Sequence, residues 1–171
     1  DISPEMIKKA RQHYPDIEFL VMDALHLELK EKFDVIIISN SIGYFIDIQG
    51  VMMALRSVCK PETRIIITYY NHFWEPILKL GEFLGIKKKS PKQNWLTIRD
   101  IRNLLSLSSF EAYRSGKRVL LPVYIPILSL LVNKIIARLP FISSFNLNTF
   151  VFARVSSSMT YAENEFSTSV I

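Results

Sequence analysis

Two acidic residues stand where a carboxylate could hold a small polar ligand. Asp1 directly precedes a helix signal, and Asp23 follows an apolar run over residues 17–22 that is typical of a buried strand. A carboxylate at the carboxyl end of a strand can accept hydrogen bonds from both hydroxyls of a ribose. Because it only accepts, it also suits an exocyclic amino group. One helix and one strand separate the two residues, which is the spacing of adjacent strands.

A second polar group closes the strongest strand signal, residues 34–39, whose centre is an unbroken run of β-branched residues. Ser39, Asn40 and Ser41 end this run, and ligands of open α/β sheets bind outside the carboxyl ends of strands. His72 follows another apolar run, over residues 64–70, and is the candidate general base. The three histidines lack a nearby cysteine or carboxylate pattern, which argues against a catalytic metal.

The elements that must position these residues alternate between helix and strand. Ser3 and Pro4 predict a helix start, because Ser3 can cap it and Pro4 loses no backbone donor there. Further helices are predicted over residues 48–58, 73–84 and 98–107, the last capped by Thr97. Further strands are predicted over residues 110–121 and 148–155. The alternation predicts an α/β fold with a mostly parallel sheet and helices on both faces.

Composition narrows the function classes. The chain has 171 residues, a net charge of +5 and one cysteine, Cys59, which we expect to be buried in an apolar helix pattern. Disulfide frameworks and cysteine-rich zinc sites are therefore excluded. The cytoplasm is the default compartment, with association at a membrane surface as an option. The cationic excess suits phosphate-bearing substrates, nucleic acid or an anionic membrane surface.

Three motifs in register resemble class I S-adenosylmethionine-dependent methyltransferases. They are Asp1-Ile2-Ser3-Pro4-Glu5-Met6-Ile7, Phe19-Leu20-Val21-Met22-Asp23-Ala24, and Phe33-Asp34-Val35-Ile36-Ile37-Ile38-Ser39-Asn40-Ser41. The resemblance implies a Rossmann-like fold and S-adenosyl-L-methionine as the cofactor. It implies that Asp1 binds the ribose, that Ile2 lies against the adenine, and that Met6 helps to wall the pocket.

The same resemblance assigns the remaining site residues. Asp23 would approach the exocyclic amine of adenine, with Ala24 beside the ring. Ser39 and Asn40 would lie beside the methionine part of the cofactor. Tyr44 and Tyr70 would face the methyl acceptor, together with His72.

One part of the family pattern is missing from the sequence. The glycine-rich loop after the first strand and the strand that should precede Asp1 are both absent, so the resemblance covers the later two-thirds of the fold. We expect a domain truncated at its N-terminus that binds the cofactor poorly by itself. The domain is predicted to span residues 1–155.

Residues 119–142 form an apolar insert between the last two predicted strands, with cationic residues around it. At 119–132 the uncharged stretch is shorter than a bilayer span and contains two prolines, which favours an interfacial segment or a packed helical hairpin. We expect a small-molecule or lipid-linked phosphate acceptor. Equally, the insert could cover the core or an interface. Residues 156–171 are predicted to be a linker followed by the start of another domain, which resembles the first strand of a glycosyltransferase.

The expected function is methyl transfer. The alternative is a degenerate, non-catalytic module of the same fold that serves docking or membrane-surface association. Nucleic-acid methylation is disfavoured, because no Asn/Asp-Pro-Pro-aromatic motif follows the strand that ends at Ser39.

Overall fold

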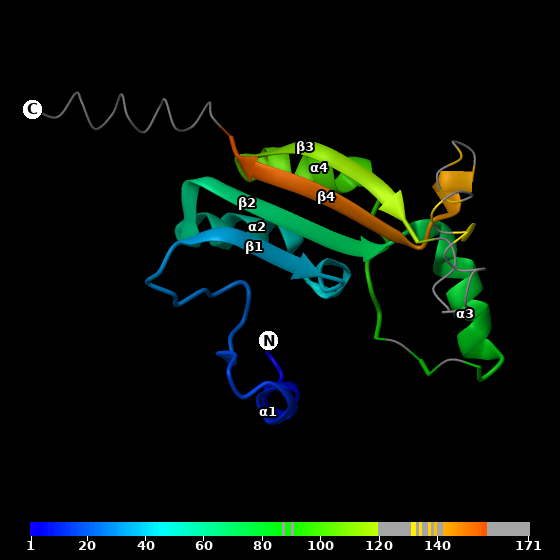
Figure 1. The fold of residues 1–171 in the computed structure, drawn as a ribbon, viewed down its shortest axis with the longest axis horizontal. Helices are drawn as coiled ribbons and strands as arrows, with labels where there is room; N and C mark the ends of the chain where they lie inside the picture. Colours follow the sequence, from blue (N-terminus) through cyan, green and yellow to red (C-terminus); the bar gives the residue numbers. More distant parts are fainter. Residues whose placement is uncertain are drawn as a thin grey trace, which may run out of the picture.

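The computed structural model describes residues 1–86, 88–89, 91–119, 131–132, 134, 137, 139 and 142–156. Within them, four strands form one sheet in the order β1-β2-β4-β3 (Figure 1). The strands are β1 (Phe33–Ser39), β2 (Cys59–Tyr70), β3 (Phe110–Arg118) and β4 (Asn148–Val155). The α-helices whose full length is described are α1 (Pro4–His13), α2 (Ile48–Leu55), α3 (Glu75–Phe83) and α4 (Ile98–Leu107).

The sheet is mixed, and the prediction of a mostly parallel sheet is wrong. β1 and β2 are parallel, whereas β4 runs antiparallel to both β2 and β3. Continuous apolar runs indicate that a strand is covered on both faces, but they carry no information about the direction of its neighbour. The chain reverses after β3, so β4 returns between β2 and β3 and hydrogen-bonds to both.

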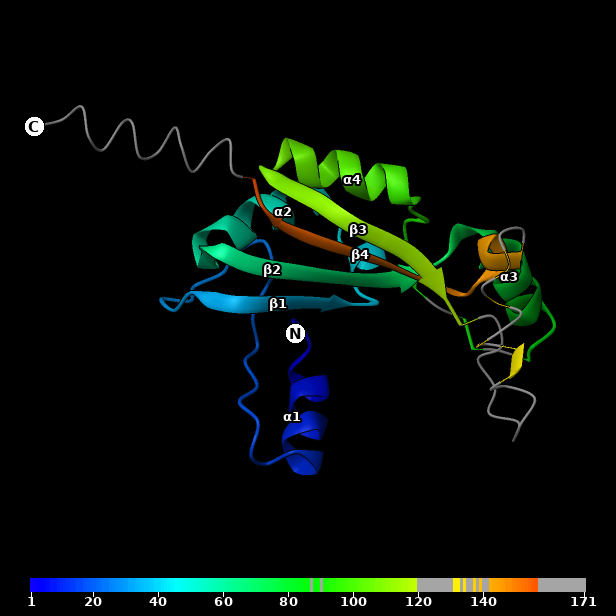
Figure 2. The same cartoon turned by 45° about the horizontal axis from the view of Figure 1, so that its top comes forward.

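Helices α2 and α4 cover one face of the sheet (Figure 2). The prediction of helices on both faces is therefore not confirmed among the described residues, because Val35 and Ile37 of β1 expose 50% and 64% of their surface on the other face. The core of the covered face brings together Ile65 and Ile67 of β2, Val151 of β4 and Leu105 of α4, all with no exposed surface. Cys59 is buried as predicted, but it begins β2 instead of ending a helix.

Local signals set the helix boundaries. At α4 the Thr97 side chain accepts from the Asp100 amide, and the Asp100 carboxylate accepts from the Thr97 amide. This reciprocal capping box satisfies donors that the first helical turn leaves unpaired. Asp47 caps α2 in a similar way by accepting from the Gly50 amide. Ser3 caps α1, with Pro4 in its first turn, as predicted.

Residues 17–22, predicted as a buried strand, are not part of the sheet. They lie beside α1, apart from the four strands (Figures 1 and 2). A strand needs hydrogen-bonding partners along its length, and in the described part of the chain the hydrogen bonds of this segment run only to Asp1, Tyr14 and the Arg11 side chain, none of which lies in the sheet. Residues 17–22 do have the apolar pattern of a strand, but a segment becomes a strand only where its backbone pairs with a neighbouring strand.

Two predicted regions fall mostly or wholly outside the described residues. These are the apolar insert over residues 119–142 and the following tail over residues 157–171. Among the residues that are described, no helix has both the length and the apolar character to cross a bilayer.

Candidate active site

Asp1 is tied to the segment before Asp23 by two backbone hydrogen bonds. The Asp1 nitrogen donates to the Leu20 carbonyl at 3.1 Å, and the Met22 amide donates to the Asp1 carbonyl at 3.0 Å. This is the bonding of a parallel strand pair in which Asp1 stands opposite Val21. Asp1 therefore lies beside the extended segment that leads to Asp23.

The Asp1 side chain keeps acceptor capacity for a ligand. Its Oδ1 accepts from the Ser3 amide at 2.8 Å, which fixes the turn into α1. An ionised carboxylate has about four acceptor positions, so one bond leaves most of them free. Ile2 and Met6, next to it, expose 69% and 57% of their surface. Carboxylate acceptors beside exposed apolar surface fit a ribose joined to a flat base.

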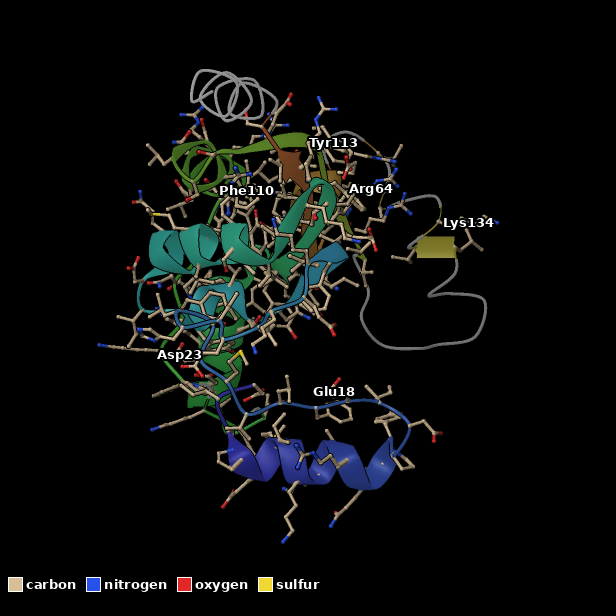
Figure 3. All side chains as sticks on the ribbon, turned by 90° about the vertical axis from the view of Figure 1, so that its left-hand side faces the viewer. Glu18, Asp23, Arg64, Phe110, Tyr113 and Lys134 are labelled. Atoms are coloured by element: carbon tan, nitrogen blue, oxygen red, sulfur yellow. The ribbon has the colours of Figure 1, made fainter. Side chains whose placement is uncertain are left out.

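Asp23 lies on the chain that leads from α1 toward the sheet (Figure 3). Its Oδ1 accepts from the Leu25 amide at 3.0 Å, and its Oδ2 lies 3.6 Å from His26 Nδ1. Ala24 and Leu25 pack against the core of the sheet. This packing holds the Asp23 loop beside α2.

The end of β1 supplies the third group. The Asn40 amide donates to the Thr68 carbonyl at 2.8 Å, which extends the parallel pairing one residue past Ser39. Asn40 then adopts φ of +51°, a left-handed conformation that asparagine tolerates better than most residues. The chain turns sharply there, and Ser39 remains exposed.

The segment around Asn94, for which the sequence predicted no role, folds over the ends of β1 and β2. The Asn94 amide donates to the Gly43 carbonyl at 2.7 Å, and the Asn94 side chain donates to the Phe45 carbonyl at 3.2 Å. A small pocket results, lined by Asn40 and Tyr70 among others. Two predicted site residues from different strands thus meet there, while Tyr44 is exposed and lies outside the lining. The sequence around Asn94 carries no motif that could have predicted this.

His72 lines a neighbouring open depression of about 480 Å³ with Asp100 and Lys117. Leu96 lines both this depression and the pocket of Asn40 and Tyr70. Hydrogen bonds from Thr97 hold the pKa of the Asp100 carboxyl below its ordinary value, and the charge of His72 lowers it further. Sequence reasoning did not place Asp100 and Lys117 in a site, because their proximity depends on the packing of α4 and β3.

Buried amides fix the end of β2 behind this depression. Asn71, 1% exposed, donates through its side chain to the carbonyls of Ser144 and Asn146 at 2.8 and 2.7 Å. Its own amide donates to the Leu147 carbonyl at 2.7 Å. The His72 backbone is therefore held against the approach to β4. Nearby, the Tyr69 hydroxyl is buried with no partner among the described residues, and burial followed by the charge of Asp100 raises its pKa.

The described residues thus form an α/β domain in which Asp1 lies beside the segment that leads to Asp23, and a small pocket lies at the ends of β1 and β2. The profile of the methyltransferase domain family matches residues 1–110. The chain belongs to this family. Among curated proteins, no sequence relative matches the chain.

Solved structures share the fold at low sequence identity. A Pyrococcus horikoshii protein is 22% identical, with a TM-score of 0.61 over 91% of this chain and 69% of its own. An S-adenosylmethionine-dependent methyltransferase from Mesorhizobium loti is 17% identical, with a TM-score of 0.63 over 90% and 77%. Magnesium protoporphyrin IX methyltransferase from Synechocystis, solved with bound SAH, is 17% identical, with a TM-score of 0.56 over 91% and 62%. Family and neighbours support S-adenosylmethionine as the cofactor.

Proposed function

We propose that the protein carrying this domain transfers the methyl group of S-adenosylmethionine to a small-molecule or lipid-linked acceptor. The observation that carries the proposal is the parallel pairing of Asp1 with the segment before Asp23. This pairing supports a site that contains both Asp1 and Asp23, and Ile2 and Met6 next to Asp1 are exposed. The methyltransferase family to which the chain belongs supplies the reaction class.

In this proposal Asp1 accepts hydrogen bonds from the ribose hydroxyls and Asp23 accepts one from the adenine amino group. Ile2, Met6 and Ala24 contact the base, and Ser39 and Asn40 lie beside the amino-acid part of the cofactor. The cofactor supplies an electrophilic methyl group on a sulfonium centre. The protein then needs mainly to align an acceptor atom with that methyl group.

Tyr70 and His72 are the proposed acceptor-side residues, with Tyr44 at the exposed rim. Tyr70 lines the pocket that also contains Asn40, and His72 lines the depression across Leu96. Where the acceptor is a hydroxyl, His72 would accept its proton as a general base. Where the acceptor needs no proton removal, His72 would only bind the acceptor.

Calorimetric titration of the full-length protein with S-adenosylhomocysteine tests the proposal. We expect saturable binding, and weaker binding of S-inosylhomocysteine, which lacks the adenine amino group. Asp23→Ala should abolish this preference, because it removes the proposed acceptor for that amino group. Asp16→Ala is the matched control, since Asp16 is an exposed acid just after α1.

Two results would count against the proposal. Saturable binding with an unchanged base preference in Asp23→Ala would remove Asp23 from the site. No detectable heat with S-adenosylhomocysteine at high concentration would favour the alternative, a non-catalytic docking module of the same fold.

A further inference from the structure

A long stretch of the C-terminal half, residues 112–162, carries cationic residues and no acidic ones. Between Glu111 and Glu163 the sequence contains no aspartate or glutamate, but it contains six lysines and arginines. Glu111 is engaged by Arg154 at 2.9 Å. A cation that is withdrawn from water within this stretch therefore has no carboxylate nearby in sequence to compensate its charge.

Lys117 is such a cation. It lies near the end of β3 and is half-buried, and this burial lowers the pKa of its ammonium group. Its Nζ donates to the Ser144 carbonyl at 3.1 Å and lies 4.9 Å from the centre of the Phe73 ring. An ammonium has three donors, so donors remain available beyond the one used here. Among the described residues, no carboxylate forms an ion pair with Lys117.

The depression around Lys117 has one acidic residue in its lining, Asp100, whose Oδ2 accepts from both the amide and the hydroxyl of Thr97 at 2.8 Å. No ion pair between Asp100 and Lys117 is found among the described residues. Arg99 adds a second cation to the lining. The volume of about 480 Å³ is within the ~300–1,000 Å³ range of small-molecule sites.

The depression also lies in the right place to hold an acceptor. Leu96 separates it from the pocket of Asn40 and Tyr70, at the ends of β1 and β2. A group anchored at Lys117 would leave the rest of its molecule free to reach past His72 toward those strand ends. The ammonium is a point charge that binds tetrahedral phosphate without the planar match that a carboxylate offers to arginine.

We propose that Lys117 anchors a phosphate group of the methyl acceptor in this depression. The inference rests on the proposed function for its biological meaning. The phosphate would accept from the remaining donors of the half-buried ammonium and would compensate its charge. Lys117 is thus a specificity-determining residue, which selects phosphorylated acceptors over neutral ones.

Binding of glycerol 3-phosphate to the full-length protein, measured by calorimetry without cofactor, tests this directly. We expect Lys117→Met to weaken binding about tenfold or more, as loss of a charge-assisted hydrogen bond predicts. Lys117→Arg should keep most of the affinity. Lys30→Met, which removes an equal charge from an exposed position, should bind like the wild type.

A parallel titration with S-adenosylhomocysteine separates the two proposals. Lys117→Met should bind it normally, which also demonstrates that the variant is folded. Failure of cofactor binding in the wild type would contradict the proposed function but leave the glycerol 3-phosphate result intact. Equal glycerol 3-phosphate binding by wild type and Lys117→Met would overturn the anchor. An equal loss in Lys30→Met would reveal diffuse electrostatics and overturn it as well.

Vesicles distinguish the source of the phosphate. The acceptor phosphate belongs to a lipid if the protein binds phosphatidic acid vesicles but neither phosphatidylcholine vesicles nor glycerol 3-phosphate. Lys117→Met should then abolish the binding to phosphatidic acid vesicles. Binding of glycerol 3-phosphate alone identifies a soluble acceptor. Absence of both interactions in the wild type would overturn the proposal.

Discussion

At the scale of single residues, the first turn of α4 shows how neighbours set the properties of a carboxylate. Asp100 accepts from the amide and the hydroxyl of Thr97, and both bonds favour its ionised form. Because its pKa is lower in the folded state, its stabilising contribution is present above the ordinary carboxyl pKa. That contribution is lost as the pH falls through the folded-state value.

Thr97→Ala should lower the free energy of unfolding at neutral pH by about 1 kcal/mol, the usual cost of losing an N-cap. It should also reduce the loss of stability between pH 5 and pH 3, about the carboxyl titration range, because Asp100 would then have a more ordinary pKa. Urea unfolding across this range measures both effects. Ser41→Ala is the control, since the Ser41 side chain caps nothing. An unchanged acid profile in Thr97→Ala would contradict the explanation.

Asn71 offers a second prediction at this scale. Its buried side chain donates to two carbonyls that connect the end of β2 to the approach to β4. Asn71→Ala should reduce the free energy of unfolding by about 1–3 kcal/mol, because buried acceptors lose their donor. Asn71→Asp, similar in shape but without the donor, should be destabilised as well. Denaturant midpoints at constant slope provide the measurement, and a stability equal to the wild type in both variants would contradict it.

At the scale of elements, local signals predicted helices better than they predicted sheet pairing. The boundaries of α4 were predicted because Thr97 and Asp100 lie within one turn of each other. The segment over residues 17–22 has a strand pattern, yet pairing depends on partners that the local sequence does not show. For the same reason, the local sequences of β2, β3 and β4 could not predict that β4 lies between the other two strands.

The residues of the candidate site likewise fall into two groups, those that local sequence signals predicted and those that they did not. Asp1 was predicted because it directly precedes a helix signal, and Asp23 and Asn40 because each follows a strand signal. Asn94, Asp100 and Lys117 were not, because they reach the site through packing between elements distant in the sequence.

The segment around Asn94 supplies a prediction for this scale. A Cβ at Gly43 would lie 2.9 Å from the Asn94 carbonyl oxygen, which is part of the backbone. Gly43→Ala should therefore push this segment away from the strand ends, at a cost of about 1–3 kcal/mol. Fluorescence of Trp95, measured with Trp74→Phe as the background, should report the displacement. Ile46→Ala, at a fully exposed position, should change nothing, and identical spectra for Gly43→Ala would contradict the predicted contact.

At the scale of the whole molecule, stability is concentrated on the covered face of the sheet. Ile65, Ile67, Val151 and Ala153 have no exposed surface, whereas Val35 and Ile37 on the other face of β1 expose 50% and 64%. The sequence indicated that the centre of β1 is apolar on both faces. It did not distinguish the face that α2 covers from the one left open.

Amide hydrogen exchange should follow this division. The amides of β2 and β4 should exchange most slowly, because both strands are paired on each side and covered by α2 and α4. Residues 24–31, which lie outside helices and strands, should exchange orders of magnitude faster. Peptide-level mass spectrometry resolves these regions, and uniform protection across both would contradict a single dominant core.

The central claim is that Asp1 binds the ribose of the cofactor, and one affinity comparison tests it most directly. Calorimetry of the full-length protein with S-adenosylhomocysteine should show binding that Asp1→Ala weakens by about 10–100-fold, the effect expected for lost hydrogen bonds to a charged group. Glu5→Ala, which removes an exposed acid from the first turn of α1, should bind like the wild type. Wild-type affinity in Asp1→Ala would contradict the claim.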